Sequence, residues 1–133
     1  MFWKRFWPAI VWSILVMFLI GLPGNVFPEI VSFWEWLSPD KIVHLIIFGI
    51  QSFLILLGFR KQYGKEKRKK YIIWAVSLTV IYGFITELLQ YYVFIGRSGN
   101  VYDALADAIG AFLGWLFFPV GLKGLKKMKL IKQ

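Results

Sequence analysis

Three ionisable residues, Asp40, Lys41 and His44, begin a stretch of chain that is otherwise lipid-soluble. On a helix, spacings of three and four residues place them on one face. Ser38 and Pro39 suit the start of a helix, so helix capping and the helix dipole are sufficient to explain Asp40. Lys41 opposes that dipole, which implies a carboxylate or an anionic ligand beside it. A histidine next to carboxylates can serve as a general acid or base.

The last predicted helix, at about 101–120, carries a second polar stripe. Asp103, Asp107, Gly110 and Gly114 follow one another at steps of four, three and four residues, so they share one face. Two glycines four residues apart let a neighbouring helix approach closely, which directs Asp107 into the bundle and away from lipid. Capping at the helix start is the alternative interpretation for Asp103.

The ionisable groups of three predicted helices converge on one layer. With a rise of about 1.5 Å per residue, His44, Glu87 and Asp107 lie about 8 to 12 Å below the outer ends of their helices. An unpaired charge at that depth is costly, so these groups should be paired or face a polar pocket. Arg97, in the turn before the last helix, suits a phosphate or carboxylate at the same opening. The candidate ligand-binding residues are Asp40, Lys41, His44, Glu87, Gln90, Arg97, Asp103 and Asp107, and the catalytic candidates among them are His44, Glu87 and Asp107.

The composition predicts a membrane protein. Of 133 residues, 59% are hydrophobic and 20% are aromatic, far above the content of a soluble domain. Apolar segments at about 6–22, 39–59, 71–94 and 101–120 match the length of membrane spans. We therefore expect an all-α membrane protein, a compact bundle of four transmembrane helices in one domain covering residues 1–133. The first segment also resembles a signal peptide, but no small-x-small cleavage site follows it.

Basic residues predict the orientation in the membrane. All Lys and Arg except Lys41 and Arg97 lie in the N-terminal segment, the loop at about 60–70 or the tail, as expected of cytoplasmic segments. Both termini are therefore predicted to be cytoplasmic, with the polar pocket facing outward. The aromatic, acidic segment "VFPEIVSFWEWLSPD" between the first two helices is expected at the extracellular membrane interface. Topology thus explains the net charge of +9, and no nucleic-acid partner is predicted.

In their order along the chain, "DKIVH", "YGFITELLQ" and "GRSGNVYDALADAIGAFLG" resemble the VanZ-like family of small bacterial membrane proteins over about residues 38–116. The family usually has Asn where this chain has Asp107, so this chain adds a negative charge there. The family takes its name from a protein associated with low-level resistance to teicoplanin, a lipid-bearing glycopeptide that binds cell-wall precursors. The resemblance implies a role in the bacterial envelope. The matching family positions are Asp40, Lys41, His44, Glu87, Gln90, Arg97, Asp103, Gly110 and Gly114.

The first functional hypothesis is a binding protein of the bacterial cytoplasmic membrane. Its outward-facing pocket would bind the anionic headgroup of an envelope lipid or lipid-linked wall precursor, held by Lys41 and Arg97. By limiting the access of a lipoglycopeptide, such a protein would contribute to teicoplanin resistance.

The alternative is a membrane-embedded hydrolase or transferase that acts on a lipid phosphate headgroup at the outer leaflet. His44 would be the acid or base, and with Asp40, Glu87 and Asp107 it could hold a divalent cation. A structural ion-pair network is a third interpretation. Transport fits four short spans poorly unless the protein oligomerises. Because no motif such as HExxH is present, the sequence assigns neither a metal site nor a cofactor.

Overall fold

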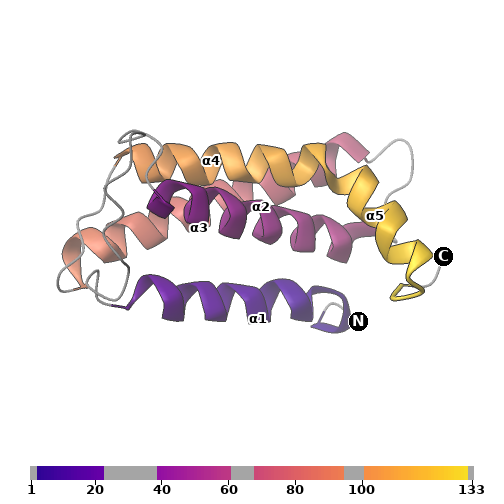
Figure 1. Ribbon diagram of the computed structural model, residues 1–133, viewed down its shortest axis with the longest axis horizontal. Helices are drawn as coiled ribbons and strands as arrows, with labels where there is room; N and C mark the ends of the chain where they lie inside the picture. Colours follow the sequence, from indigo (N-terminus) through magenta and orange to yellow (C-terminus); the bar gives the residue numbers. More distant parts are fainter. Residues whose placement is uncertain (1–2, 23–38, 61–67, 95–100, 132–133) are drawn as a thin grey trace.

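The computed structural model describes residues 3–22, 39–60, 68–94 and 101–131, and the helices lie within these ranges. No strand occurs among the described residues. The turn with Arg97 and the segment expected at the membrane interface, except for its last two residues, lie outside them. The helices are α1 (Trp3–Ile20), α2 (Pro39–Phe59), α3 (Arg68–Tyr92), α4 (Val101–Leu116) and α5 (Phe118–Lys127) (Figure 1).

Three helices, α1, α2 and α3, are each long and apolar enough to cross a membrane, and α4 and α5 meet this test as a bent pair. The predicted boundaries of the first three spans hold to within one helical turn. The described part of the chain is thus all-helical, as predicted, and its helices are those of a multi-pass membrane protein.

The fourth predicted span, 101–120, is not one continuous helix. It ends at Leu116, and the chain turns by 53° into α5. Pro119 lies in the first turn of α5 and has no backbone N–H to bond the carbonyl of Trp115, four residues before it. The proline ring also crowds that carbonyl, so the chain bends at Phe117. Beyond the bend, α5 carries exposed lysines that suit a membrane surface.

The most extensive helix contact is between α2 and α4, and glycines make it possible. A Cβ atom at Gly110 would collide with the backbone carbonyl of Leu45, and one at Gly114 with the carbonyl of Gly49. Because these neighbours are backbone atoms, neither helix can yield by a side-chain movement. The close helix approach that the glycine pair predicted is therefore present, and the helix that approaches α4 there is α2.

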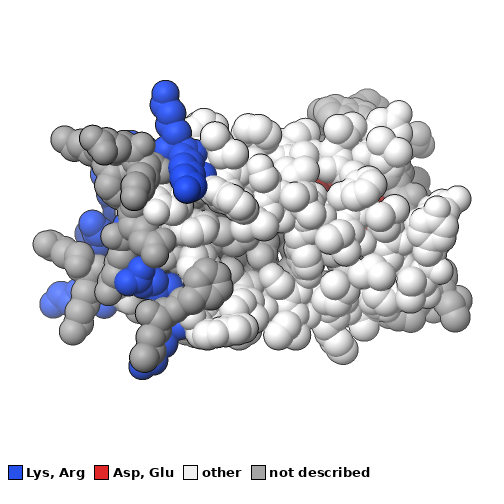
Figure 2. Space-filling model, turned by 180° about the vertical axis from the view of Figure 1, so that it is seen from behind, with Lys and Arg blue, Asp and Glu red and all other residues white. Residues whose placement is uncertain are grey.

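The two ends of the bundle differ in charge. The start of α1, the start of α3 and α5 meet at one end (Figure 1). Lys and Arg gather at that end of the surface shown in Figure 2, whereas little acidic surface is visible. The starts of α2 and α4 lie at the opposite end, together with Asp40, His44 and Asp103. This separation matches the distribution of basic residues on which the orientation prediction rests.

Candidate functional site

Three helices bring His44, Glu87 and Asp107 together, and we call these residues the inner cluster. Nδ1 of His44 lies 2.8 Å from Oδ1 of Asp107 and 3.6 Å from Oε1 of Glu87. Because a carboxylate only accepts hydrogen bonds, Nδ1 of His44 is the donor to Asp107. All three side chains are buried. The structure thus joins the three groups that the depth argument placed in one layer.

Small residues allow α4 to bring Asp107 so close to its neighbours. A Cβ atom at Gly83 of α3 would stand 2.9 Å from both Cβ and Oδ2 of Asp107. Gly83 therefore leaves the space that the Asp107 side chain fills. Together with the glycines that bring α4 against α2, it sets the distance between Asp107 and His44.

A second group of residues lies at the start of α2 and α4, and we call Asp40, Lys41 and Asp103 the rim cluster. Nζ of Lys41 is 3.7 Å from Oδ1 of Asp103, and the two side chains are 20% and 8% exposed. The carboxylate partner that Lys41 was predicted to need is thus Asp103. Asp40 is exposed, whereas Asp103 is buried.

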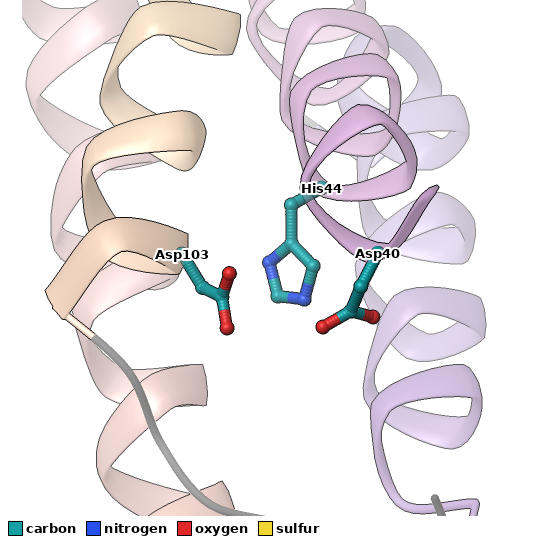
Figure 3. Close-up of side chains that lie close together, drawn as sticks. All are labelled: Asp40, His44 and Asp103. Atoms are coloured by element: carbon teal, nitrogen blue, oxygen red, sulfur yellow. The ribbon is translucent and has the colours of Figure 1, made fainter. Parts of the chain in front are cut away.

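His44 connects the two clusters. Figure 3 shows its imidazole ring between the carboxylates of Asp40 and Asp103. One donor atom from each of these three residues lies within 4.8 Å of the others, and the same holds for the inner cluster. Histidine and carboxylate donors at such distances suit a metal ion as well as proton transfer.

Within the described part of the chain, the two clusters contain more acidic than basic side chains. The two clusters contain four carboxylates but only one lysine and one histidine. Removing carboxylates from water is costly unless cations or hydrogen bonds compensate them. The inner cluster, with two buried carboxylates beside one histidine, therefore has a composition that suits a cation.

Gln90 is buried in the last turns of α3, and its amide is directed toward α1. Its Nε2 donates to the backbone carbonyl of Ile20 at 3.5 Å. The last carbonyls of a helix lack partners within the helix, so this contact also supports the end of α1. The predicted ligand-binding role of Gln90 stays a prediction. Arg97, also predicted to bind the ligand, lies outside the described residues.

Sequence reasoning missed a polar contact network below the site. Nε2 of Gln51 donates to Oγ of Ser13 at 2.9 Å, and the Tyr82 hydroxyl donates to the Ser13 carbonyl at 2.6 Å. Nε1 of Trp12 donates to the carbonyl of Ile47 at 3.0 Å. These bonds connect α1 to α2 and α3. The available signal was Gln51, which follows His44 by seven residues and so shares its helix face.

One small cavity adjoins the site, and a larger groove lies elsewhere along α1. A cavity of about 60 Å³ is lined by α1 and α2 and reaches Asp40 and His44. That volume is enough for water or an ion but not for a lipid headgroup. A larger groove of about 650 Å³ lies between α1 and α3, and its lining is mostly apolar, from Ile14 to Leu22 and at Phe94.

Comparison with known proteins identifies relatives of the chain. It is 22% identical over 116 residues to Cation/H(+) antiporter 17 of Arabidopsis thaliana, a match that covers 80% of this chain. The chain spans only 14% of the length of that protein. No solved structure matches. The family model described as VanZ/LLP1 matches residues 4–122, which is nearly the whole chain and includes every described residue of both clusters. The chain belongs to the VanZ/LLP1 family.

Proposed function

We propose that this protein binds the anionic headgroup of an envelope lipid or lipid-linked wall precursor at its rim cluster. It would lie in the bacterial cytoplasmic membrane with both termini inside and the rim cluster outward. The gathering of Lys and Arg at the opposite end supports this orientation. The observation that carries the proposal is the position of Lys41, a partly exposed cation at the entrance to a buried polar site.

Two helix starts add to the attraction that Lys41 exerts on an anion. Both α2 and α4 begin at the rim cluster, so the positive ends of their dipoles point toward it. Phosphate groups bind readily at such positions because the first backbone N–H groups of a helix lack partners within it. The headgroup would contact Lys41 from outside, where its side chain is partly exposed, and leave the buried carboxylates below it.

The groove between α1 and α3 supports a lipid as the ligand. Its lining is mostly apolar, and it extends to Gly21, Leu22 and Phe94, near the end of the bundle where the rim cluster lies. An acyl chain in this groove would run beside the bundle while its headgroup reached the rim cluster. Burial of apolar surface would then add to the affinity provided by charge.

Replacing Lys41 by methionine is expected to weaken phosphatidylglycerol binding by about 10-fold or more, because a hydrogen bond to a charged group contributes about 1.5–3 kcal/mol. Native mass spectrometry of the purified protein, titrated with this lipid, measures the change. Lys123→Met removes an exposed lysine of α5 and serves as the control. Equal binding by the Lys41 and Lys123 variants would contradict the proposal.

The buried hydrogen bond from His44 to Asp107 favours a second candidate function, hydrolysis or transfer at a lipid phosphate. A carboxylate that orients a histidine is a common arrangement for a general base. The same titration distinguishes the two functions, because turnover changes the mass of the lipid with time. Conversion that stops in His44→Gln would show an enzyme, and an unchanged lipid mass would leave binding as the function.

Protection against a lipid-bearing glycopeptide is the expected physiological result of headgroup binding. Expression in a susceptible bacterium should raise the inhibitory concentration of teicoplanin a few-fold, because an occupied headgroup is less accessible to the drug. A glycopeptide without a lipid chain should be affected less, since it does not insert beside the protein. Protection that persists in the Lys41→Met variant would show that the rim cluster is not involved.

A further inference from the structure

We infer that the inner cluster binds a divalent transition-metal cation through Nδ1 of His44 and carboxylate oxygens of Glu87 and Asp107. This inference goes beyond the proposed function, because the cation site lies below the rim cluster and needs no lipid. From the sequence, a divalent cation held by His44 with Asp40, Glu87 and Asp107 belonged only to the enzyme alternative, and no metal site was assigned. The three helices α2, α3 and α4 each supply one ligand.

The distances between the donor atoms fit a single ion. Zinc lies about 2.0–2.2 Å from histidine nitrogen and carboxylate oxygen, so two of its ligands can be at most about 4.4 Å apart. Nδ1 of His44 is 2.8 Å from Oδ1 of Asp107 and 3.6 Å from Oε1 of Glu87, both within that limit. Small rotations of the side chains would therefore place all three donors around one cation.

Charge and burial indicate a divalent ion. Glu87 is 6% exposed and Asp107 is 1% exposed, and together they carry two negative charges when ionised. A divalent cation neutralises both at once, whereas Lys41 is at the rim beside Asp103. Oδ2 of Asp107 is also buried and accepts no hydrogen bond within the described part of the chain. Buried carboxylate oxygens generally have such a partner, so the hydrogen bond from His44 to Oδ1 leaves Asp107 capable of a further interaction.

The surroundings of His44 suit a metal ligand. The ring lies between the carboxylates of Asp40 and Asp103 (Figure 3), and carboxylates next to a ligating histidine commonly fix its orientation. One imidazole with two carboxylates is a donor set for zinc or manganese, whereas sites built only from oxygen favour magnesium or calcium. The cavity of about 60 Å³ beside His44 is lined from α1 and α2, so it could hold a water molecule next to the ligating histidine.

Calorimetric titration of the chelator-treated, full-length protein in detergent micelles with zinc chloride tests this site. We expect one zinc ion per chain in the wild type, and at least about 10-fold weaker binding in Glu87→Gln and Asp107→Asn. These replacements keep the shape of each side chain and remove its charge. Binding of Mn²⁺, followed by its electron paramagnetic resonance signal, provides a second measurement on the same samples.

Lys41→Met is the matched control, because it removes a charge from the rim cluster and leaves the three ligands in place. It should retain zinc binding while losing phosphatidylglycerol, so failure of the metal site and failure of the headgroup site are distinguishable. Size-exclusion chromatography and tryptophan fluorescence verify that each variant is folded. If one variant does not fold, the other still tests the site.

Three outcomes would overturn the inference. The first is a folded wild type that binds neither zinc nor manganese at millimolar concentration. The second is equal binding by the wild type and the two ligand variants, which would place the ion at exposed carboxylates. The third is binding that survives Glu87→Gln and Asp107→Asn but is lost in Asp40→Asn or Asp103→Asn, which would move the ion to the rim cluster.

Discussion

Replacing Gly110 by alanine is expected to lower the free energy of unfolding by about 1–3 kcal/mol, the usual cost of overpacking a well-packed interior. The added Cβ would meet the backbone carbonyl of Leu45, so α2 and α4 must separate to accept it. Their separation would also lengthen the distance from His44 to Asp107. The loss should therefore appear in stability and, if the metal inference holds, in zinc affinity. Denaturant titration in micelles, followed by tryptophan fluorescence, measures the stability.

Gly124→Ala is the matched control for this prediction. Gly124 is an exposed glycine of α5, and a Cβ atom there would meet nothing within 4 Å. Alanine at an exposed helical position stabilises a helix by up to about 1 kcal/mol relative to glycine. Opposite signs for the two substitutions would establish that the close approach of α2 and α4 sets the stability. A Gly110→Ala variant as stable as the control would contradict the observed packing.

Removal of the His44 side chain is expected to cost about 3–5 kcal/mol, the usual effect of breaking a buried ion pair. In His44→Ala the carboxylates of Glu87 and Asp107 would remain buried without their histidine partner. Adding Asp107→Ala should recover part of the loss, because it removes one of those carboxylates. The coupling energy from the double-mutant cycle is expected to be about 1–3 kcal/mol, measured on chelator-treated protein.

A second double-mutant cycle, between His44 and Lys126, is the control for this coupling energy. Lys126 is an exposed residue of α5, at the other end of the bundle. Distant substitutions usually add to within about 0.5 kcal/mol. If the stability changes of the His44 and Asp107 substitutions were also additive, the hydrogen bond between these residues would contribute nothing to the stability. If His44→Ala is fully stable, the structural ion-pair interpretation fails.

The composition of the two clusters suits ligand binding as well as a structural network. An ion pair that only held helices together would be expected to balance its charges, and a buried ion pair is in any case weak support for stability. Within the described part of the chain, the two clusters contain four carboxylates, one lysine and one histidine. A divalent cation bound in the inner cluster would bring these charges closer to balance.

Several features of the fold and the site could be predicted from the sequence. The apolar segments predicted the bounds of α1, α2 and α3 to within one turn. The length of a membrane span depends on the thickness of the membrane and can be read from one segment without knowing its neighbours. Helical periodicity placed the polar residues of α2 and α4 on single faces. The dipole argument predicted a carboxylate or an anionic ligand beside Lys41, and the structure places the carboxylate of Asp103 there.

Other features depended on the tertiary structure. Periodicity determines which face a residue occupies, but not how two helices are rotated and shifted against each other. The packing of the helices determines which carboxylate accepts the hydrogen bond from His44. That packing depends on the backbone contacts at Gly110 and Gly114 and on the space at Gly83. The bend at Phe117 has a different cause. Apolar residues continue across the bend, so the sequence indicated one span. The helix nevertheless ends there, because Pro119 has no backbone N–H with which to continue the hydrogen-bond pattern.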